Sequence, residues 1–169
     1  MLGPKEGAMA MSRKLAELLG ARRVTYRTLR HAEACTSQEV AHAAHVPGRK
    51  MAKVVALRDD RGRWLLAVVP APCHVDLRAL SGVSGHHELR LASEREIERR
   101  FPDAEPGAMP PFEVLYRVPV FIDLTFADAR DIYFEDGTHH GVVGMRVQDY
   151  IQAAEPILGR FAQEPVAGH

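Results

Sequence analysis

The spacing of hydrophobic residues predicts two short helices in the first third of the chain. Three leucines between positions 15 and 19 mark one face of a helix that begins at a Ser12 N-cap and stops at Gly20. A second helix begins at a capping box near position 36 and runs through alanines to Pro47. Between these helices, apolar and basic residues alternate over 24–31, which is typical of a half-buried strand.

A β-hairpin is predicted in the middle of the chain. Two apolar runs, 51–57 and 64–69, flank a polar turn that contains Gly62. The first run carries a single charge, Lys53. A lysine in such a strand either reaches solvent, pairs with an anion, or lines a cleft that a negative ligand enters. A charge that protects a sheet edge is the alternative without a ligand.

The second half of the chain predicts further short elements. They are a helix at 75–80, a strand at 88–91, a helix at 93–101, strands at 118–124, 131–135 and 142–146, and a helix at 147–158. Hairpin-linked strands interspersed with irregular helices indicate an α+β fold with one mixed, largely antiparallel sheet.

Composition is consistent with one domain. The chain has 169 residues, of which 46% are hydrophobic and 26% charged, enough to bury a real core. We expect a domain over 12–162 between two loosely held ends, 1–11 and 163–169. Two cysteines without a CxxC motif and the lack of a secretory leader favour the reducing cytoplasm. No apolar stretch approaches the roughly 20 residues that span a bilayer, so no membrane association is expected.

Charge is balanced over the chain but unevenly distributed. The formal net charge is zero, which argues against a whole-surface field for nucleic acid. From 13 to 63 there are twelve basic residues against five acidic ones, and from 94 to 136 there are eleven acidic residues against five basic ones. This asymmetry fits either a local basic face for a polyanion or two solvated surfaces.

Common catalytic and cofactor motifs are missing from the sequence. His42 and His45 share one face of a predicted helix, but neither HExxH nor a Cys/His quartet occurs, so no metal is expected. There is no GxSxG elbow for a nucleophilic serine. The phosphate loops GxxxxGK[ST] and GxGxxG do not occur either, and we expect no cofactor.

A proline-rich loop at 106–112 is a second candidate for function. Gly107 lets the backbone turn and approach a ligand closely, while Pro110 and Pro111 stiffen the segment. A rigid loop with free N–H groups can hold a carbonyl oxygen as negative charge develops on it. A stiffened connection with no ligand is the alternative interpretation.

Lys53 and this loop occur within an ordered series of segments that resembles a known family. The segments are 31–41, Lys53 at the head of an apolar strand, 75–80, 91–94, 107–112 and the glycine-containing strand-turn 134–139. Together they resemble the YbaK/prolyl-tRNA-synthetase-associated editing domain over nearly the whole chain. The sequence departs from the family in two places, since Val54 replaces the usual threonine and Pro110 is an extra proline. These departures leave the preferred amino acid open.

The resemblance implies a partial barrel with surrounding helices and a stand-alone, trans-acting aminoacyl-tRNA deacylase. Its substrates would be esters of small amino acids such as alanine, serine, cysteine or threonine. The family's lysine corresponds to Lys53, and its GxxxP loop to Gly107 and Pro111. We hypothesise that the loop amides polarise the ester carbonyl, that Lys53 holds a phosphate or the developing charge, and that water or the ribose 2′-hydroxyl completes hydrolysis.

Other residues are assigned to binding. Those expected to line the substrate site are His31, Ala108, Met109, Phe112, Gly137 and His139. Arg49 and Lys50 are expected to contact tRNA phosphates. The expected partner is aminoacyl-tRNA, and a synthetase or a second copy of the chain stays open as a further partner. The alternative function is a module that binds aminoacyl-tRNA or a nucleotide-like ligand without hydrolysing it.

Overall fold

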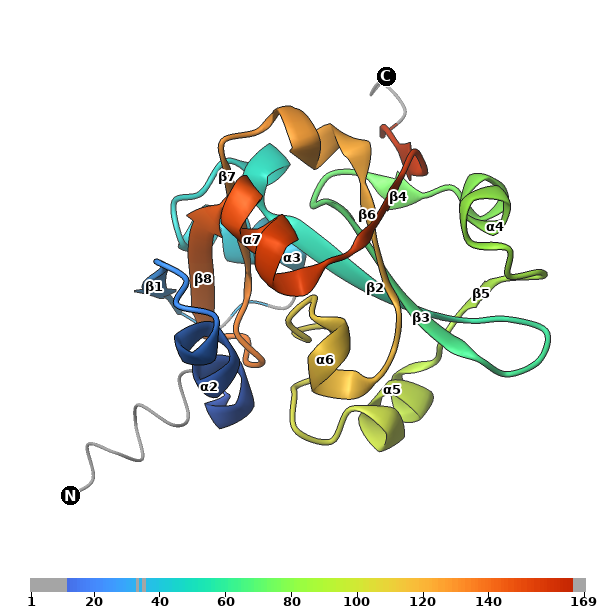
Figure 1. Ribbon diagram of the computed structural model, residues 1–169, viewed down its shortest axis with the longest axis horizontal. Coiled ribbons are helices and arrows are strands. Elements are labelled where there is room, and N and C mark those ends of the chain that lie inside the picture. Colours follow the sequence, from blue (N-terminus) through green and yellow to red (C-terminus); the bar gives the residue numbers. More distant parts are fainter. Residues whose placement is uncertain (1–11, 33, 35, 166–169) are drawn as a thin grey trace.

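Strands that lie far apart in the sequence form three hydrogen-bonded sheets in the computed structural model (Figure 1), which describes residues 12–32, 34 and 36–165. The five-stranded sheet has the order β5 (Arg90–Leu91), β2 (Ala52–Arg58), β3 (Trp64–Pro70), β6 (Val120–Asp123) and β9 (Ile157–Gly159). The three-stranded sheet has the order β1 (Arg27–Arg30), β8 (Gly141–Arg146) and β7 (Asp131–Glu135). A two-stranded sheet pairs β10 (Ala162–Gln163) with β4 (His74–Val75).

The two larger sheets meet at an isolated parallel bridge between Met51 and Tyr133. The β2–β3 hairpin is antiparallel, as are both ladders of the three-stranded sheet, whereas β6 pairs in parallel with β3 and with β9. The predicted mixed α+β class is confirmed. Its sheet is an open arrangement of separate ladders joined by the bridge rather than a closed barrel.

Six α-helices surround the sheets in the described part of the chain. They are α2 (Arg13–Ala21), α3 (Ser37–Ala43), α4 (Leu77–Ser84), α5 (Glu94–Arg100), α6 (Glu113–Tyr116) and α7 (Val147–Ala154). Short 3-10 helices occupy Gly48–Lys50 and Leu124–Asp128. The predicted caps are confirmed: Ser12 accepts from the N–H of Leu15, and full capping boxes start α3 at Thr36 and α5 at Ser93.

Several predicted element ends were wrong. The final helix stops at Ala154, because Pro156 disfavours helical geometry at Glu155, which adopts a left-handed conformation, and strand β9 follows. The second helix ends at Ala43, four residues before Pro47. The short helix α6 was not predicted. Segments 1–11 and 166–169 lie outside the described residues, and Glu164, within the expected tail, forms a salt bridge with Arg49.

Side chains of β2 point alternately into different apolar clusters. Ala52 and Val54 pack in the central core between the sheets. Lys53 points to the opposite face of the strand because successive side chains alternate. On that outer face, Leu57 belongs to a cluster that includes α4, and Met51 to a cluster that includes α3. Lys53 therefore lies between two apolar patches that α3 and α4 cover.

Candidate active site

Lys53 lies in the β2–β3 hairpin opposite Val69 and is half-buried. Burial lowers the pKa of its ammonium group, and the neighbouring Cys73 acts weakly in the opposite direction. No salt bridge of the described residues includes Lys53. A partly desolvated charge is normally paired, so an ammonium in this position is suited to meeting an anionic ligand.

The bridge between the sheets places Lys53 and Glu135 on the same face. Met51 pairs in parallel with Tyr133, and these two side chains share the cluster under α3. Residues two positions further along each strand point to the same side. Lys53 follows Met51 by two residues, and Glu135 follows Tyr133 by two. The outer face of the junction thus carries the ammonium group of Lys53 and the buried carboxyl group of Glu135.

Glu135 is hydrogen-bonded to His139. The carboxyl group is buried, and its Oε1 lies 3.0 Å from Nδ1 of His139. Burial raises the pKa of Glu135, while His139 and His31 act against that rise. The hydrogen bond with Glu135 raises the pKa of His139, against a smaller effect of burial. Both shifts mean that the pair holds protons more tightly than the separate groups do.

The second ring nitrogen of His139 reaches the proline-rich loop. Its Nε2 lies 2.9 Å from the carbonyl oxygen of Pro106. A carbonyl oxygen only accepts hydrogen bonds, so Nε2 carries a proton. The hydrogen bond between Nδ1 and Glu135 then requires a second proton, held by either group. The pair therefore carries two protons and no net charge while both hydrogen bonds are made.

Gly107, the residue after Pro106, is exposed and has a φ of +87°. This left-handed backbone conformation would be strained in a residue with a side chain. A Cβ built at this position would lie 3.9 Å from Cε1 of His139, so the imidazole sits against the loop at this residue. Within the described part of the chain, the N–H of Gly107 has no acceptor. This arrangement leaves a backbone donor exposed beside an imidazole.

The far end of the loop is fixed in the core. The hydroxyl of Tyr150 on α7 donates to the carbonyl oxygen of Pro111 at 2.7 Å, and both residues are buried. The side chains of Met109 and Phe112 belong to the central cluster, and Ala108 is fully buried. These three residues were expected to line the substrate site. Each residue is at most 1% exposed, and the N–H groups of Ala108 and Phe112 already donate to the carbonyls of Glu105 and Pro110.

His31 approaches the same carboxyl group from another strand end. Its N–H donates to the carbonyl of His140, and its Nδ1 lies 2.6 Å from the carbonyl oxygen of Ala32, so Nδ1 carries a proton. The Nε2 atom is buried and has no partner among the described residues. This buried nitrogen therefore lacks a donor, which a small molecule such as a bound water would supply.

Two acidic residues that the sequence did not single out hold the loops together. Glu105 donates its N–H to the carbonyl of Gly137 and accepts the N–H of His139 on its carboxylate at 2.7 Å. Asp136 accepts both the N–H and the hydroxyl of Thr138, which closes the turn in which Gly137 has a φ of +105°. The signal for Asp136 was its position before Gly137, where a short acidic side chain caps backbone N–H groups, whereas the contact of Glu105 spans 34 residues and has no local signal.

The two predicted tRNA contacts have different surroundings. Arg49 forms a salt bridge of 2.6 Å with Glu164, and this contact raises the pKa of Arg49. Lys50, the next residue, is half-buried and takes part in no salt bridge of the described segments. Lys50 is therefore the freer of the two cations to meet a phosphate group.

Comparison with known proteins gives this geometry a context. The model of the aminoacyl-tRNA editing domain matches residues 31–153, which include Lys53, the Gly107 loop and His139. The chain belongs to the aminoacyl-tRNA editing domain family. Since the match covers most of the chain, the family resemblance expected from the sequence is confirmed.

Solved structures show the same fold. The hypothetical protein APE2540 is 18% identical, with a TM-score of 0.81 over 89% of this chain and 100% of its own. A proposed trans-editing enzyme for prolyl tRNA synthetase is 17% identical, with a TM-score of 0.75 over 90% of this chain and 96% of its own. No match was found among curated proteins.

The described residues also bear on metals and membranes. They contain no group of three or more His, Cys, Asp or Glu side chains that could hold a metal ion. Among the helices in the same ranges, none is both long and apolar enough to cross a bilayer. The candidate residues for a site in this part of the chain are Gly107 with its unbonded N–H, His31, His139, Glu135 and Lys53.

Proposed function

We propose that this editing-domain protein is a trans-acting deacylase that hydrolyses the ester bond of mischarged aminoacyl-tRNA. The observation that carries the proposal is the contact of His139 with both Glu135 and Pro106, which holds an exposed Gly107 N–H beside a proton-bearing imidazole. An aminoacyl ester is already activated, so a placed water and a donor for the developing oxyanion suffice for its hydrolysis.

In this mechanism the Gly107 N–H donates to the ester carbonyl oxygen as negative charge develops there. A water molecule attacks the carbonyl carbon, and the bond from that carbon to the ribose oxygen breaks. A proton from the water is transferred to the ribose oxygen, which leaves as a hydroxyl group. Lys53 holds the terminal adenosine phosphate, an interaction that its half-buried, unpaired ammonium favours.

The proposed substrates carry small amino acids, namely alanine, serine, cysteine or threonine. A synthetase pocket discriminates one methylene by only about 1–3 kcal/mol, so small wrong amino acids are attached at appreciable rates and a separate hydrolytic site is needed. The fold shared with a proposed trans-editing enzyme for prolyl tRNA synthetase supports tRNA specific for proline as the first acceptor to test.

The test supplies proline-specific tRNA charged separately with each of these four amino acids, and with proline as the control. We expect at least one mischarged species to be hydrolysed far above the spontaneous rate and the prolyl ester to be spared. A module that only binds the ester would shield it and slow its spontaneous loss. That result, or rates equal to the spontaneous ones for all four amino acids on this tRNA and on other acceptors, including threonine-specific tRNA, would refute the deacylase.

A further inference from the structure

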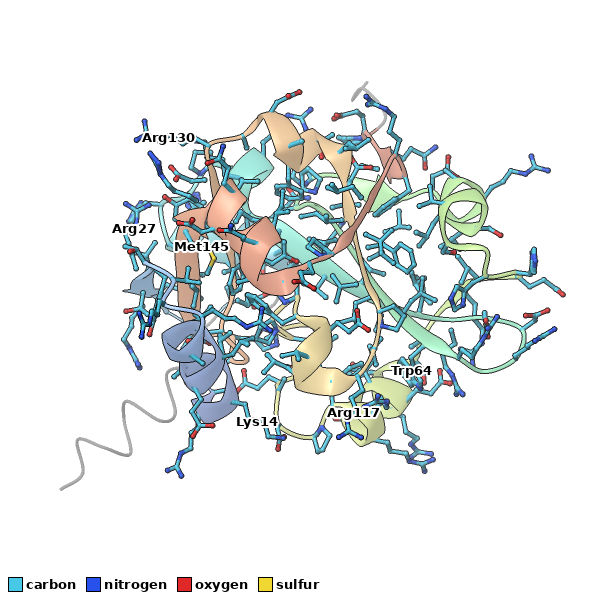
Figure 2. All side chains as sticks on the ribbon, in the orientation of Figure 1. Lys14, Arg27, Trp64, Arg117, Arg130 and Met145 are labelled. Atoms are coloured by element: carbon cyan, nitrogen blue, oxygen red, sulfur yellow. The ribbon has the colours of Figure 1, made fainter. Side chains whose placement is uncertain are left out.

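Four basic side chains line an open depression at one end of the three-stranded sheet. The depression has a volume of about 470 Å³. Its basic residues are Arg27, Lys50, Arg130 and Arg146, and its acidic residue is Asp131. Figure 2 shows Arg27, Arg130 and Met145, which all line it, on the same side of the molecule beside β1 and β8.

Strand pairing explains why these residues converge. Arg27 on β1 lies opposite Gly144 on β8, and Gly144 lies opposite Tyr133 on β7, so all three occupy one face. Arg146 and Asp131 pair two positions further along and share that face. Lys50 joins from the turn before Met51, which bridges Tyr133. This is the same outer face that carries Glu135.

The position of Arg27 is fixed before any ligand arrives. A Cβ at Gly144 would lie 2.5 Å from the ring of Tyr133, so only glycine leaves room for that ring. Arg27 donates to the Tyr133 hydroxyl, and its guanidinium carbon lies 5.3 Å from the ring centroid. A guanidinium has five N–H donors, so others remain for an anion.

The charges in the depression are not paired with other charges in the part of the chain that the structure describes. No salt bridge of the described residues includes Lys50, Arg130, Arg146 or Asp131. Four cations against one carboxylate give a positive potential that favours an anion with several acceptor oxygens. A phosphate diester of a nucleic acid matches this requirement.

We infer that this depression binds backbone phosphates in the single-stranded 3′ end of the aminoacyl-tRNA, an inference that rests on the proposed function. Asp131 and Glu135 are four residues apart on β7, which corresponds to about 13 Å along a strand. A tRNA end whose ester lies beside His139 therefore has its preceding phosphates within reach of the depression. The site positions the substrate and takes no part in the bond cleavage.

The test measures binding of uncharged tRNA, so it does not depend on hydrolysis. Fluorescence anisotropy gives the Kd of the wild type, of the double variant Arg130→Ala/Arg146→Ala and of Arg95→Ala. Arg95 is an exposed arginine on α5 with no salt bridge in the described segments and serves as the matched control. Thermal unfolding of each variant checks that the fold is intact.

We expect the double variant to bind tRNA about tenfold more weakly and the control to bind like the wild type. The slope of log Kd against log salt should fall by about 0.7 for each single-strand phosphate that the double variant no longer neutralises. A tRNA shortened by its single-stranded 3′ end should bind the wild type and the double variant equally.

Unchanged Kd and salt slope in the double variant would overturn the inference, as would an equal decrease in affinity for the shortened tRNA. If the wild type hydrolyses no ester, and the double variant binds full-length tRNA, but not the shortened tRNA, more weakly than the wild type does, the phosphate site stands and the deacylase fails. If hydrolysis is normal and binding is unchanged in the double variant, the deacylase stands and the phosphate site fails.

Discussion

The Nε2 atom of His139 lies 2.9 Å from the carbonyl oxygen of Pro106, which ties the proline-rich loop to the β7–β8 turn. The hydrogen bond requires a proton on Nε2, and the contact of Nδ1 with Glu135 requires another. Loss of either proton leaves two acceptors facing each other. The position of Gly107, the residue after Pro106, is therefore coupled to the protonation of this pair.

Stability should fall as pH rises through the range in which His139 loses its proton. The pKa of His139 in the folded protein is raised above 6.5, so its contribution is fully present below pH 6.5 and lost above the folded value. The pKa of Glu135 is also raised, so the loss of its proton likewise lowers the stability of the fold as pH rises above 4.5. Thermal unfolding between pH 5 and 9 measures the effect, and a melting temperature that rises over pH 7–9 would contradict it.

Glu135→Gln should weaken this pH dependence and keep the loop in place. A glutamine side chain can donate N–H to Nδ1 of neutral His139, whose Nε2–H still reaches Pro106. Glu135→Ala has no such donor and should lose activity at least tenfold. The pH profile of deacylation by both variants checks this pair of outcomes. Equal behaviour of the two variants would show that the carboxyl group does not position His139.

Gly107→Ala should impair catalysis more than folding. The left-handed φ of this residue costs an alanine about 1–2 kcal/mol, and the loop can relax only by moving its N–H. The nearest atom to the new methyl group lies at 3.9 Å, so no steric clash contributes. We expect kcat to fall at least tenfold with a stability loss of about 1 kcal/mol, measured by chemical denaturation. Wild-type kcat in a variant with that stability loss would exclude the Gly107 N–H as the oxyanion donor.

Tyr150→Phe should destabilise the protein by about 1–3 kcal/mol, since it leaves the buried carbonyl of Pro111 without its donor. The ring itself packs against Phe112 and Phe134, and phenylalanine preserves those contacts. Chemical denaturation gives the free energy of unfolding. A change below about 0.5 kcal/mol would mean that the hydroxyl does not fix the loop.

The sequence predicted those elements whose signals are local. The capping boxes at Thr36 and Ser93 and the Gly62 hairpin were located because each depends on residues a few positions apart. Strand β9 was missed because the apolar residues of this strand closely follow α7 and were taken for the last turn of that helix. Its place in the sheet depends on parallel pairing with β6, more than thirty residues earlier, which no local pattern reveals.

The same distinction applies to the site. Lys53 and Gly107 were chosen as candidates because a charge in an apolar strand and a glycine among prolines are unusual in themselves. Glu135 was not, because an acidic residue at a strand end is ordinary until the Met51–Tyr133 bridge and the His139 contact reveal its burial. The sequence also did not reveal which residues of the loop are buried, since Met109 and Phe112 fill the core while Gly107 stays exposed.

The measurement that tests the account most directly is single-turnover hydrolysis of mischarged tRNA by Lys53 variants. Removal of a charge-assisted interaction worth about 1.5–3 kcal/mol predicts a roughly 10- to 100-fold slower reaction for Lys53→Ala, with partial recovery in Lys53→Arg. Lys14→Ala is the control, because that lysine is exposed and pairs with Asp103 at 2.8 Å on the surface. Hydrolysis by Lys53→Ala at the wild-type rate would contradict the central claim that this lysine holds the substrate in the editing site.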